Sequence, residues 1–255
     1  MARPLFAQIN LGALRANLAL VRAKAPKAQV LAVVKANAYG HGLTRVLPAL
    51  EDADGLALLE LDNAVRLREM HYTRRVLLLE GFFEERELAQ IAAHRLATVV
   101  HDAEQLQMLE KAVLPRPLEV FVKINTGMNR LGFAPQDARM VCDRLAHAPS
   151  VAALRVMTHL ARADEDDGIK EALAVFDAAC SGMPYPRSIA NSAGVIRYDE
   201  VGGDIVRPGI VLYGASPFPF DTAEMLGMRP VMTLRSEIIG VQELRAQDDV
   251  GYGAN

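Results

Sequence analysis

The chain of 255 residues contains no tryptophan, two cysteines and few aromatic side chains, which make up 5% of the sequence. The cysteines, Cys142 and Cys180, stand far apart without metal-ligand spacing. We therefore expect two reduced thiols in the core of a cytoplasmic protein rather than a disulfide. Neither sign of charge is in excess, because 28 lysines and arginines face 31 acidic residues. The sequence thus gives no indication of a basic surface for nucleic acid.

Long apolar stretches are missing as well. The first residues, MARPLFAQINLGAL, contain no basic region followed by an apolar signal segment, and no later run is long enough to span a bilayer. We therefore expect a cytoplasmic protein that is not bound to a membrane. Hydrophobic residues nevertheless make up 51% of the chain, enough for a large core.

Short apolar runs of strand length alternate with amphipathic segments of helix length. This pattern and the length predict an α/β fold, a single (β/α)8 TIM-type barrel. The predicted strands are residues 30–34, 55–59, 76–80, 97–100, 118–124, 153–158, 187–190 and 205–207. The predicted helices are residues 11–23, 61–70, 84–94, 102–111, 135–146 and 169–180, with Asp102 and Gln105 as an N-cap pair.

The pattern changes after Tyr213. Residues 217–220 are interrupted by proline, and VMTLRSEIIGVQEL at 231–244 predicts an antiparallel strand with no helix after it. We therefore place a boundary near Arg229 and assign residues 11–228 to the barrel.

The strand at 30–34 leads into Lys35 and then into a glycine-rich turn with Tyr39 and His41. Residues at the carboxyl ends of barrel strands converge on one face, where barrel enzymes present a reactive amine. A lysine at such a position can also be merely solvated. The lysine is therefore a candidate catalytic residue on position alone.

The segment VVKANAYGHG resembles the cofactor-lysine signature of bacterial alanine racemases, fold-type III enzymes that depend on pyridoxal 5′-phosphate (PLP). Further matches follow in family order: INTGMNRLGF, MTHLARAD, IANSAG, VRPGIVLYG and VGYG. The resemblance covers residues 5–253. It implies a PLP-binding barrel that interconverts L-alanine and D-alanine, in bacteria that make D-alanine as a peptidoglycan precursor or degrade it.

The resemblance implies roles for the matched residues that follow the predicted strands. Lys35 would form the Schiff base with PLP, and Tyr39 would contact its phosphate. Arg130 would hydrogen-bond the phenolic oxygen of PLP and contact the substrate. Lys123 matches a lysine that is often carbamylated in the family, and a carbamate would turn a buried cation into an anion able to orient Arg130.

His159 matches a family histidine that hydrogen-bonds both the active-site tyrosine and the arginine beside the pyridine ring. On its own such a histidine is more often structural. Leu160 stands where phenylalanine is usual in the family, a change in packing that leaves the imidazole untouched.

A phosphate held by the loops after strands seven and eight recurs in barrels. The resemblance assigns this role to Ser192, Gly209 and Ile210, helped by Tyr39. Asn191, which stands with Ser192 at the start of a helical turn, is also implied to be a cofactor-binding residue. Each of these short motifs is weak alone, because Asn-Ser and Pro-Gly are common in turns.

Arg207 would lie opposite the pyridine nitrogen of PLP. An arginine cannot accept a proton from that nitrogen, so the ring would be a weaker electron sink than in enzymes with a carboxylate there. Reprotonation at Cα, and therefore racemisation, would be favoured over transamination or decarboxylation.

Racemisation needs two bases on opposite faces of a planar intermediate. Lys35 would supply one. The terminal DDVGYGAN resembles the family's VGYG motif, in which Tyr252 matches a tyrosine that reaches across a homodimer interface into the partner's site. His159 and Arg207 would lower the effective pKa of this tyrosine.

In the family, the strand after the barrel enters a C-terminal β-domain, into which the first residues also pair. We therefore expect residues 1–10 and 229–255 to be strands of such a domain, most of which the 255 residues do not contain. The alternatives are a PLP-binding barrel that manages cofactor supply without turnover, a broad-specificity racemase, or a decarboxylase of the same fold. Arg207 argues against the decarboxylase.

Overall fold

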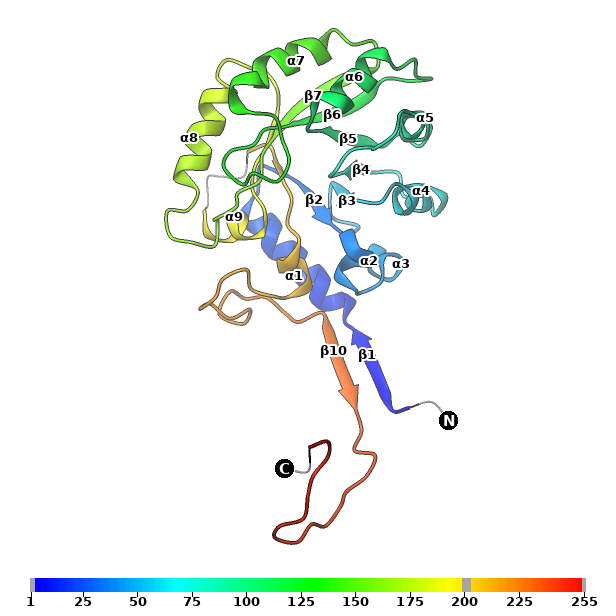
Figure 1. Ribbon diagram of the computed structural model, residues 1–255, viewed down its shortest axis with the longest axis vertical. Helices are drawn as coiled ribbons and strands as arrows, with labels where there is room; N and C mark the ends of the chain where they lie inside the picture. The colour runs from blue at the N-terminus through cyan, green and yellow to red at the C-terminus, as the bar shows by residue number, and fades with distance from the viewer. Residues whose placement is uncertain (1–2, 199–202, 254–255) are drawn as a thin grey trace.

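The computed structural model describes residues 3–198 and 203–253, which form a barrel with a two-stranded ribbon projecting from it (Figure 1). Strands β2 to β9 close the barrel in sequence order, each parallel to its neighbours. They are Gln29–Val33, Gly55–Leu58, Arg75–Leu78, Ala97–Val100, Leu118–Lys123, Val151–Met157, Arg187–Ser188 and Ile205–Val206. The predicted barrel is confirmed.

Helices surround the barrel on the outside (Figure 1). The elements α1 and α3 to α9 span Leu11–Lys24, Leu43–Val46, Leu61–Glu69, Glu85–Ala93, Ala103–Lys111, Ala138–Ala146, Lys170–Ala179 and Ser192–Arg197. Short 3₁₀ segments lie at Leu47–Ala49, Pro135–Asp137 and Ile210–Tyr213. The helix predicted from residue 135 therefore starts with a 3₁₀ turn. Asp102 caps α6 as predicted, because its side chain accepts a hydrogen bond from the Gln105 backbone N–H at 2.9 Å.

Both faces of the barrel strands are buried. Along β2, Leu31 and Val33 belong to an inner cluster inside the barrel, whereas Val30 and Ala32 pack outward in the larger cluster beneath the helices. A strand covered on both sides reads as a continuous apolar run, which is why these strands were recognisable in the sequence. Cys142 and Cys180 are free and buried in the outer layer.

Asn17 fixes helix α1 to the chain that leaves the barrel. Its buried side-chain amide donates to the carbonyls of Leu212 and Arg229 at 3.0 and 2.8 Å, and its oxygen accepts from the Arg229 backbone N–H at 2.8 Å. An unpaired amide at this depth would be costly. Asn17 thus joins segments about 200 residues apart and defines where the ribbon begins.

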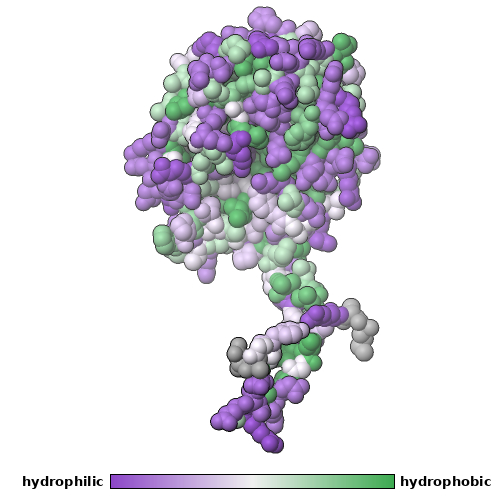
Figure 2. Space-filling view, viewed as in Figure 1, coloured by the Kyte–Doolittle hydropathy of each residue, from purple (hydrophilic) through white to green (hydrophobic). Residues whose placement is uncertain are grey.

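Strands β1 (Leu5–Ile9) and β10 (Met232–Ser236) form the antiparallel ribbon, with Leu5 opposite Ser236. The predicted pairing is confirmed, but the strand predicted over 231–244 is wrong in length. Beyond Ser236 the described residues offer no strand to pair with. The ribbon points away from the barrel and exposes apolar side chains among polar ones (Figures 1 and 2). No helix of the described residues is long and apolar enough to cross a membrane.

Candidate functional site

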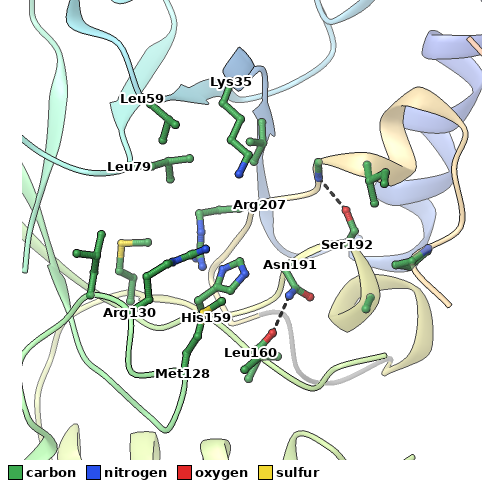
Figure 3. A pocket seen from close by; sticks show the side chains of 18 of the residues that line it. Lys35, Leu59, Leu79, Met128, Arg130, His159, Leu160, Asn191, Ser192 and Arg207 are labelled. Atoms are coloured by element: carbon green, nitrogen blue, oxygen red, sulfur yellow. Dashed lines mark hydrogen bonds between the residues drawn. The ribbon is translucent and has the colours of Figure 1, made fainter. Parts of the chain in front are cut away.

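A cavity of about 350 Å³ opens at the carboxyl ends of the barrel strands. Its walls carry four cationic side chains and two carboxylates, so positive charge is in excess. These are Lys35, Lys123, Arg130 and Arg207, with Glu80 and Asp164 as the acids. Figure 3 shows Lys35 pointing into the cavity from one side, with Arg130, His159 and Arg207 facing it.

Lys35 opens the element α2 (Lys35–Tyr39), which is a left-handed turn rather than an ordinary helix. Residues 36 to 38 have φ between 50° and 56° and ψ between 48° and 53°, and Tyr39 has φ 51°. None of them is glycine, and each left-handed residue of this kind costs roughly 1–2 kcal/mol. In the glycine-rich turn expected from the sequence, the strained backbone therefore lies in residues 36–39, before Gly40 and Gly42.

His41 supports this turn. Its buried ring donates from Nδ1 to the carbonyl oxygens of Ala38 and Tyr39, both at 3.0 Å. The same ring lies 4.6 Å from the Tyr213 ring, which in turn stacks on Tyr39 at 4.8 Å between centroids. Tyr213 is fixed by donating to the Val33 carbonyl at 3.1 Å. The turn is thus fixed on both sides, and Tyr39 is oriented by the stack.

Ser192 and Gly209 join the loops after β8 and β9 at one end of the cavity (Figure 3). The Gly209 backbone N–H donates to Ser192 Oγ at 2.8 Å. A Cβ at Gly209 would lie 2.3 Å from the Tyr39 hydroxyl, so only glycine leaves this hydroxyl in place. Two hydroxyls and a glycine backbone beside a cationic cavity are suited to a phosphate group.

Asn191 and Ile210 also line this end of the cavity. Asn191 is the N-cap of α9: its side-chain oxygen accepts from Gly194 N–H at 3.0 Å, and its amide donates to the Leu160 carbonyl at 2.9 Å. The polar atoms of Asn191 therefore serve the fold directly. Burial raises the pKa of Tyr39, which remains a neutral hydroxyl at physiological pH.

Arg207 is buried, and it links the ends of three strands. Its guanidinium donates to the Thr158 carbonyl at 2.5 Å and to the Ser188 hydroxyl. Burial lowers the pKa of Arg207 to about 10, so the side chain stays charged at neutral pH. Its position at the cavity wall therefore places a permanent positive charge there.

His159 faces the same cavity. Burial first, then the positive charges of Arg207 and Lys123, lower its pKa to about 3, so the imidazole is neutral at physiological pH. The expected hydrogen bond between His159 and Arg207 is not formed in the part of the chain that the structure describes. The guanidinium instead donates to oxygen acceptors on β8 and the loop after β7.

Lys123 is buried at the end of β6. Burial and the charge of Arg207 lower the pKa of Lys123 to about 8, whereas Glu80 acts in the opposite direction. Arg130 lies on the loop that returns from β6, where Asn125 accepts from the backbone N–H groups of Gly127 and Asn129 at 3.1 and 3.0 Å. This tight loop brings Arg130 to the cavity (Figure 3), which Lys123 also lines.

The comparisons with known proteins agree with this geometry. Residues 9–217 match the model of the alanine racemase N-terminal domain. The alanine racemase of Nitrosospira multiformis is 52% identical over 99% of this chain and 72% of its own length. The catabolic alanine racemase of Klebsiella aerogenes is 48% identical over 99% of this chain and 71% of its own. The chain belongs to the alanine racemase family.

Solved structures of the family have the same fold. The biosynthetic alanine racemase of Pseudomonas aeruginosa superposes with a TM-score of 0.95 at 41% identity, covering 99% of this chain and 72% of that one. The enzyme of Acinetobacter baumannii gives a TM-score of 0.91 at 34% identity, with the same two coverages. Biosynthetic and catabolic members thus both resemble this chain.

Most residues that the alanine racemase motifs singled out meet at this cavity, but Tyr252 does not. It is fully exposed, at 106% of its reference area, beyond the ribbon. Sequence reasoning missed Glu80 and Asp164 as cavity residues. A signal for Glu80 was present, since it follows the apolar run 76–79, and a polar residue at a strand end faces the active end of a barrel.

The left-handed turn yields a prediction for His41. We expect His41→Ala to lower the free energy of unfolding by about 2–3 kcal/mol, because a buried ring and its hydrogen bonds to the turn are lost. Urea unfolding measures this change. His147→Ala is the matched control, since His147 makes a similar bond to the Asp143 carbonyl at 2.7 Å in an exposed position. Equal losses in the two variants would contradict this role of His41.

A second prediction concerns the glycine beneath Tyr39. Gly209→Ala moves the Tyr39 hydroxyl, so under the PLP site proposed below we expect about 10-fold weaker PLP binding, the scale of a lost hydrogen bond to a charged group. Equilibrium titration with PLP measures the affinity. Gly240→Ala is the control, because a Cβ at Gly240 meets nothing within 4 Å. Unchanged affinity in Gly209→Ala would remove Gly209 and Tyr39 from the phosphate site.

Proposed function

We propose that this chain is the PLP-binding barrel of an alanine racemase, an isomerase that interconverts L-alanine and D-alanine. The observation that carries the proposal is the convergence of Lys35, Arg130, His159 and Arg207 on one cavity. Family membership and the 52% identity to a named alanine racemase support it. A PLP carrier without turnover and a broad-specificity racemase have no comparable support.

PLP would be held at both ends of the cavity. Lys35 would bind it covalently, and Tyr39, Ser192, Gly209 and Ile210 would hold its phosphate. The positive excess of the cavity favours an anionic cofactor. When bound, PLP supplies the electron sink that makes the Cα proton of an amino acid acidic.

Arg207 would determine how strong that sink is. Its guanidinium carries only donors, so a pyridine nitrogen facing it stays unprotonated. His159 cannot supply a proton there, because its low pKa keeps it neutral. The environment therefore favours rapid return of a proton to Cα over loss of a carboxylate or amine transfer.

Arg130 would contact the phenolic oxygen of the cofactor and the substrate carboxylate. Lys123 beside it has a pKa near 8, so an appreciable share of its amine is neutral in mildly alkaline solution. A neutral amine is the form that reacts with carbon dioxide. We propose that carbamylated Lys123 orients Arg130 as an anion.

Lys35 and Tyr252 would be the two bases. Lys35 reaches the substrate from one side, and one base alone tends to return its proton to the face it came from. Tyr252 would act on the opposite face of a partner chain's site in a homodimer. Its full exposure in this chain leaves the side chain available for such a contact.

We further propose that β1 and β10 belong to a second, β-rich domain, separate from the barrel at residues 11–228. They pair with each other as a sheet of their own. Leu5, Phe6 and Leu234 are 52%, 52% and 69% exposed, which is typical of strands that await further packing.

Lys35 is tested by its covalent bond to the cofactor. Borohydride reduction of the PLP-loaded protein followed by peptide mapping should find PLP on the peptide that contains Lys35. Lys123 is the internal control, because it lines the same cavity. Attachment to Lys123 or any other lysine contradicts the assignment of Lys35, and absence of alanine racemisation by the PLP-loaded protein would contradict the proposed function as a whole.

Arg207→Glu should lower racemisation and raise transamination, because a carboxylate allows the pyridine nitrogen to be protonated. Alanine turnover and pyruvate formation are measured on the same sample. Arg207→Lys, which keeps a positive charge, controls for the loss of the bonds to Thr158 and Ser188. If Arg207→Glu folds and racemises without new pyruvate, Arg207 does not face the ring.

Tyr252 can be tested by mixing two inactive chains. Tyr252→Phe alone should lower turnover by about 100-fold or more, the scale of one positioned base. Mixing it with Lys35→Ala should restore part of the activity, because mixed dimers contain one site with both bases. Tyr198→Phe is the control. Full activity in Tyr252→Phe, or no recovery on mixing, would contradict a second base supplied by a partner chain.

A further inference from the structure

A second cavity, of about 590 Å³, lies at the opposite end of the barrel from the candidate active site. Three loops that each lead from a helix into a strand form most of its wall: residues 70–74 before β4, 94–96 before β5 and 112–117 before β6. Figure 1 shows these three helix and strand pairs side by side on one flank of the barrel. None of the residues that line this second cavity takes part in the proposed racemase chemistry.

The lining of this cavity is strongly cationic. Among the described residues that line it, five are arginines and one is a carboxylate, Glu119. Glu119 is already engaged, because Arg75 and Arg155 lie 3.0 and 3.2 Å from its oxygens. Glu119 is therefore not free to pair with Arg95 or Arg116.

The arginines divide into structural and available ones. Arg68 donates to the carbonyls of His94, Tyr72, Arg74 and Arg95, which binds the loops together. Arg95 and Arg116, in contrast, are exposed, and no described residue forms an ion pair or side-chain hydrogen bond with either guanidinium. Two guanidinium groups at one cavity are thus available to a ligand.

Tyr72 contributes a buried hydroxyl without a partner. Within the described chain, its Oη is inaccessible and forms no hydrogen bond. Burial raises the pKa of Tyr72 to about 12, so the hydroxyl is a neutral donor at physiological pH. A buried polar group of this kind is rare in proteins and is normally satisfied by a ligand or water.

The backbone beside these groups is strained. Helices α4 and α5 both end with the six-residue hydrogen bond of a Schellman motif, from Tyr72 N–H to Leu67 and from Leu96 N–H to Ile91, each at 3.0 Å. The left-handed residue of this motif is usually glycine. Here it is His71, with φ 63°, and Arg95, with φ 52°. Both strained positions thus bring a side chain that can carry positive charge to the cavity.

We propose that this second cavity binds the phosphate group of a small phosphorylated molecule, held by Arg95, Arg116 and the hydroxyl of Tyr72. Guanidinium groups bind phosphate through paired N–H donors, and a neutral phenol adds a further donor. The proposal is independent of the racemase function, because the cavity lies outside the racemase site.

The test uses PLP-loaded protein, so that the first phosphate site is already filled. Inorganic phosphate and then glycerol phosphate are titrated by isothermal calorimetry in a chloride buffer. If both compounds bind, the ligand of this cavity is a phosphate ester. If inorganic phosphate alone binds, the ligand is the free phosphate ion. Arg95→Gly and Arg116→Ala should each weaken binding about 10-fold, the scale of one charge-assisted hydrogen bond. Tyr72→Phe should weaken it several-fold.

Two controls separate the site from general effects. Arg66 is an exposed arginine on helix α4 that does not line the cavity. The Arg66→Ala variant should therefore bind phosphate as the parent does. Arg95→Gly should melt at or above the parent temperature, because glycine fits the left-handed position. Racemase turnover should remain unchanged in all these variants. Absence of phosphate binding, or equal weakening by Arg66→Ala and Arg95→Gly, overturns the proposal.

Discussion

The left-handed turn after β2 is the constraint on which the candidate active site depends. Lys35 and Tyr39 reach one cavity because the backbone of the residues between them is left-handed. Asn37 offsets part of the cost, because its side-chain oxygen accepts a hydrogen bond from the Leu43 backbone N–H at 2.8 Å. Further compensation comes from outside the turn. His41 donates to the carbonyls of the turn, and Tyr213 packs against the rings of Tyr39 and His41. Strain is retained here because buried aromatic packing stabilises it.

Burial of charge gives the cavity its chemical character. Arg207 stays protonated, His159 stays neutral, and Lys123 is shifted close to the physiological range. These three outcomes share a cause, since desolvation disfavours every charged form and the always-charged guanidinium then disfavours its cationic neighbours. The site thus combines the fixed positive charge of Arg207 with a neutral imidazole, His159, which does not attract an anion away from Arg207.

Arginine side chains have different roles at the two ends of the barrel. At the carboxyl end, Arg207 is fully buried and is fixed by oxygen acceptors on β8 and the loop after β7. At the opposite end, Arg68 joins loops through backbone carbonyls, whereas no residue in the described ranges accepts a hydrogen bond from the Arg95 guanidinium. Since the amino end of a barrel usually serves stability, the phosphate site that we propose there would give this end a second role.

The sequence by itself determined the barrel, its eight strands to within about two residues, and the cavity residues carried by the motifs, because doubly buried strands read as apolar runs and strand ends converge. It could not determine that KANAY turns left-handed, since only Asn37 in this turn favours that conformation locally, and His41 and Tyr213 supply the remaining stabilisation. Nor could it determine the partners of Arg207, the protonation of His159 and Lys123, or the cavity at Arg95 and Arg116. These depend on burial and on contacts between segments distant in the chain, which only the tertiary structure decides.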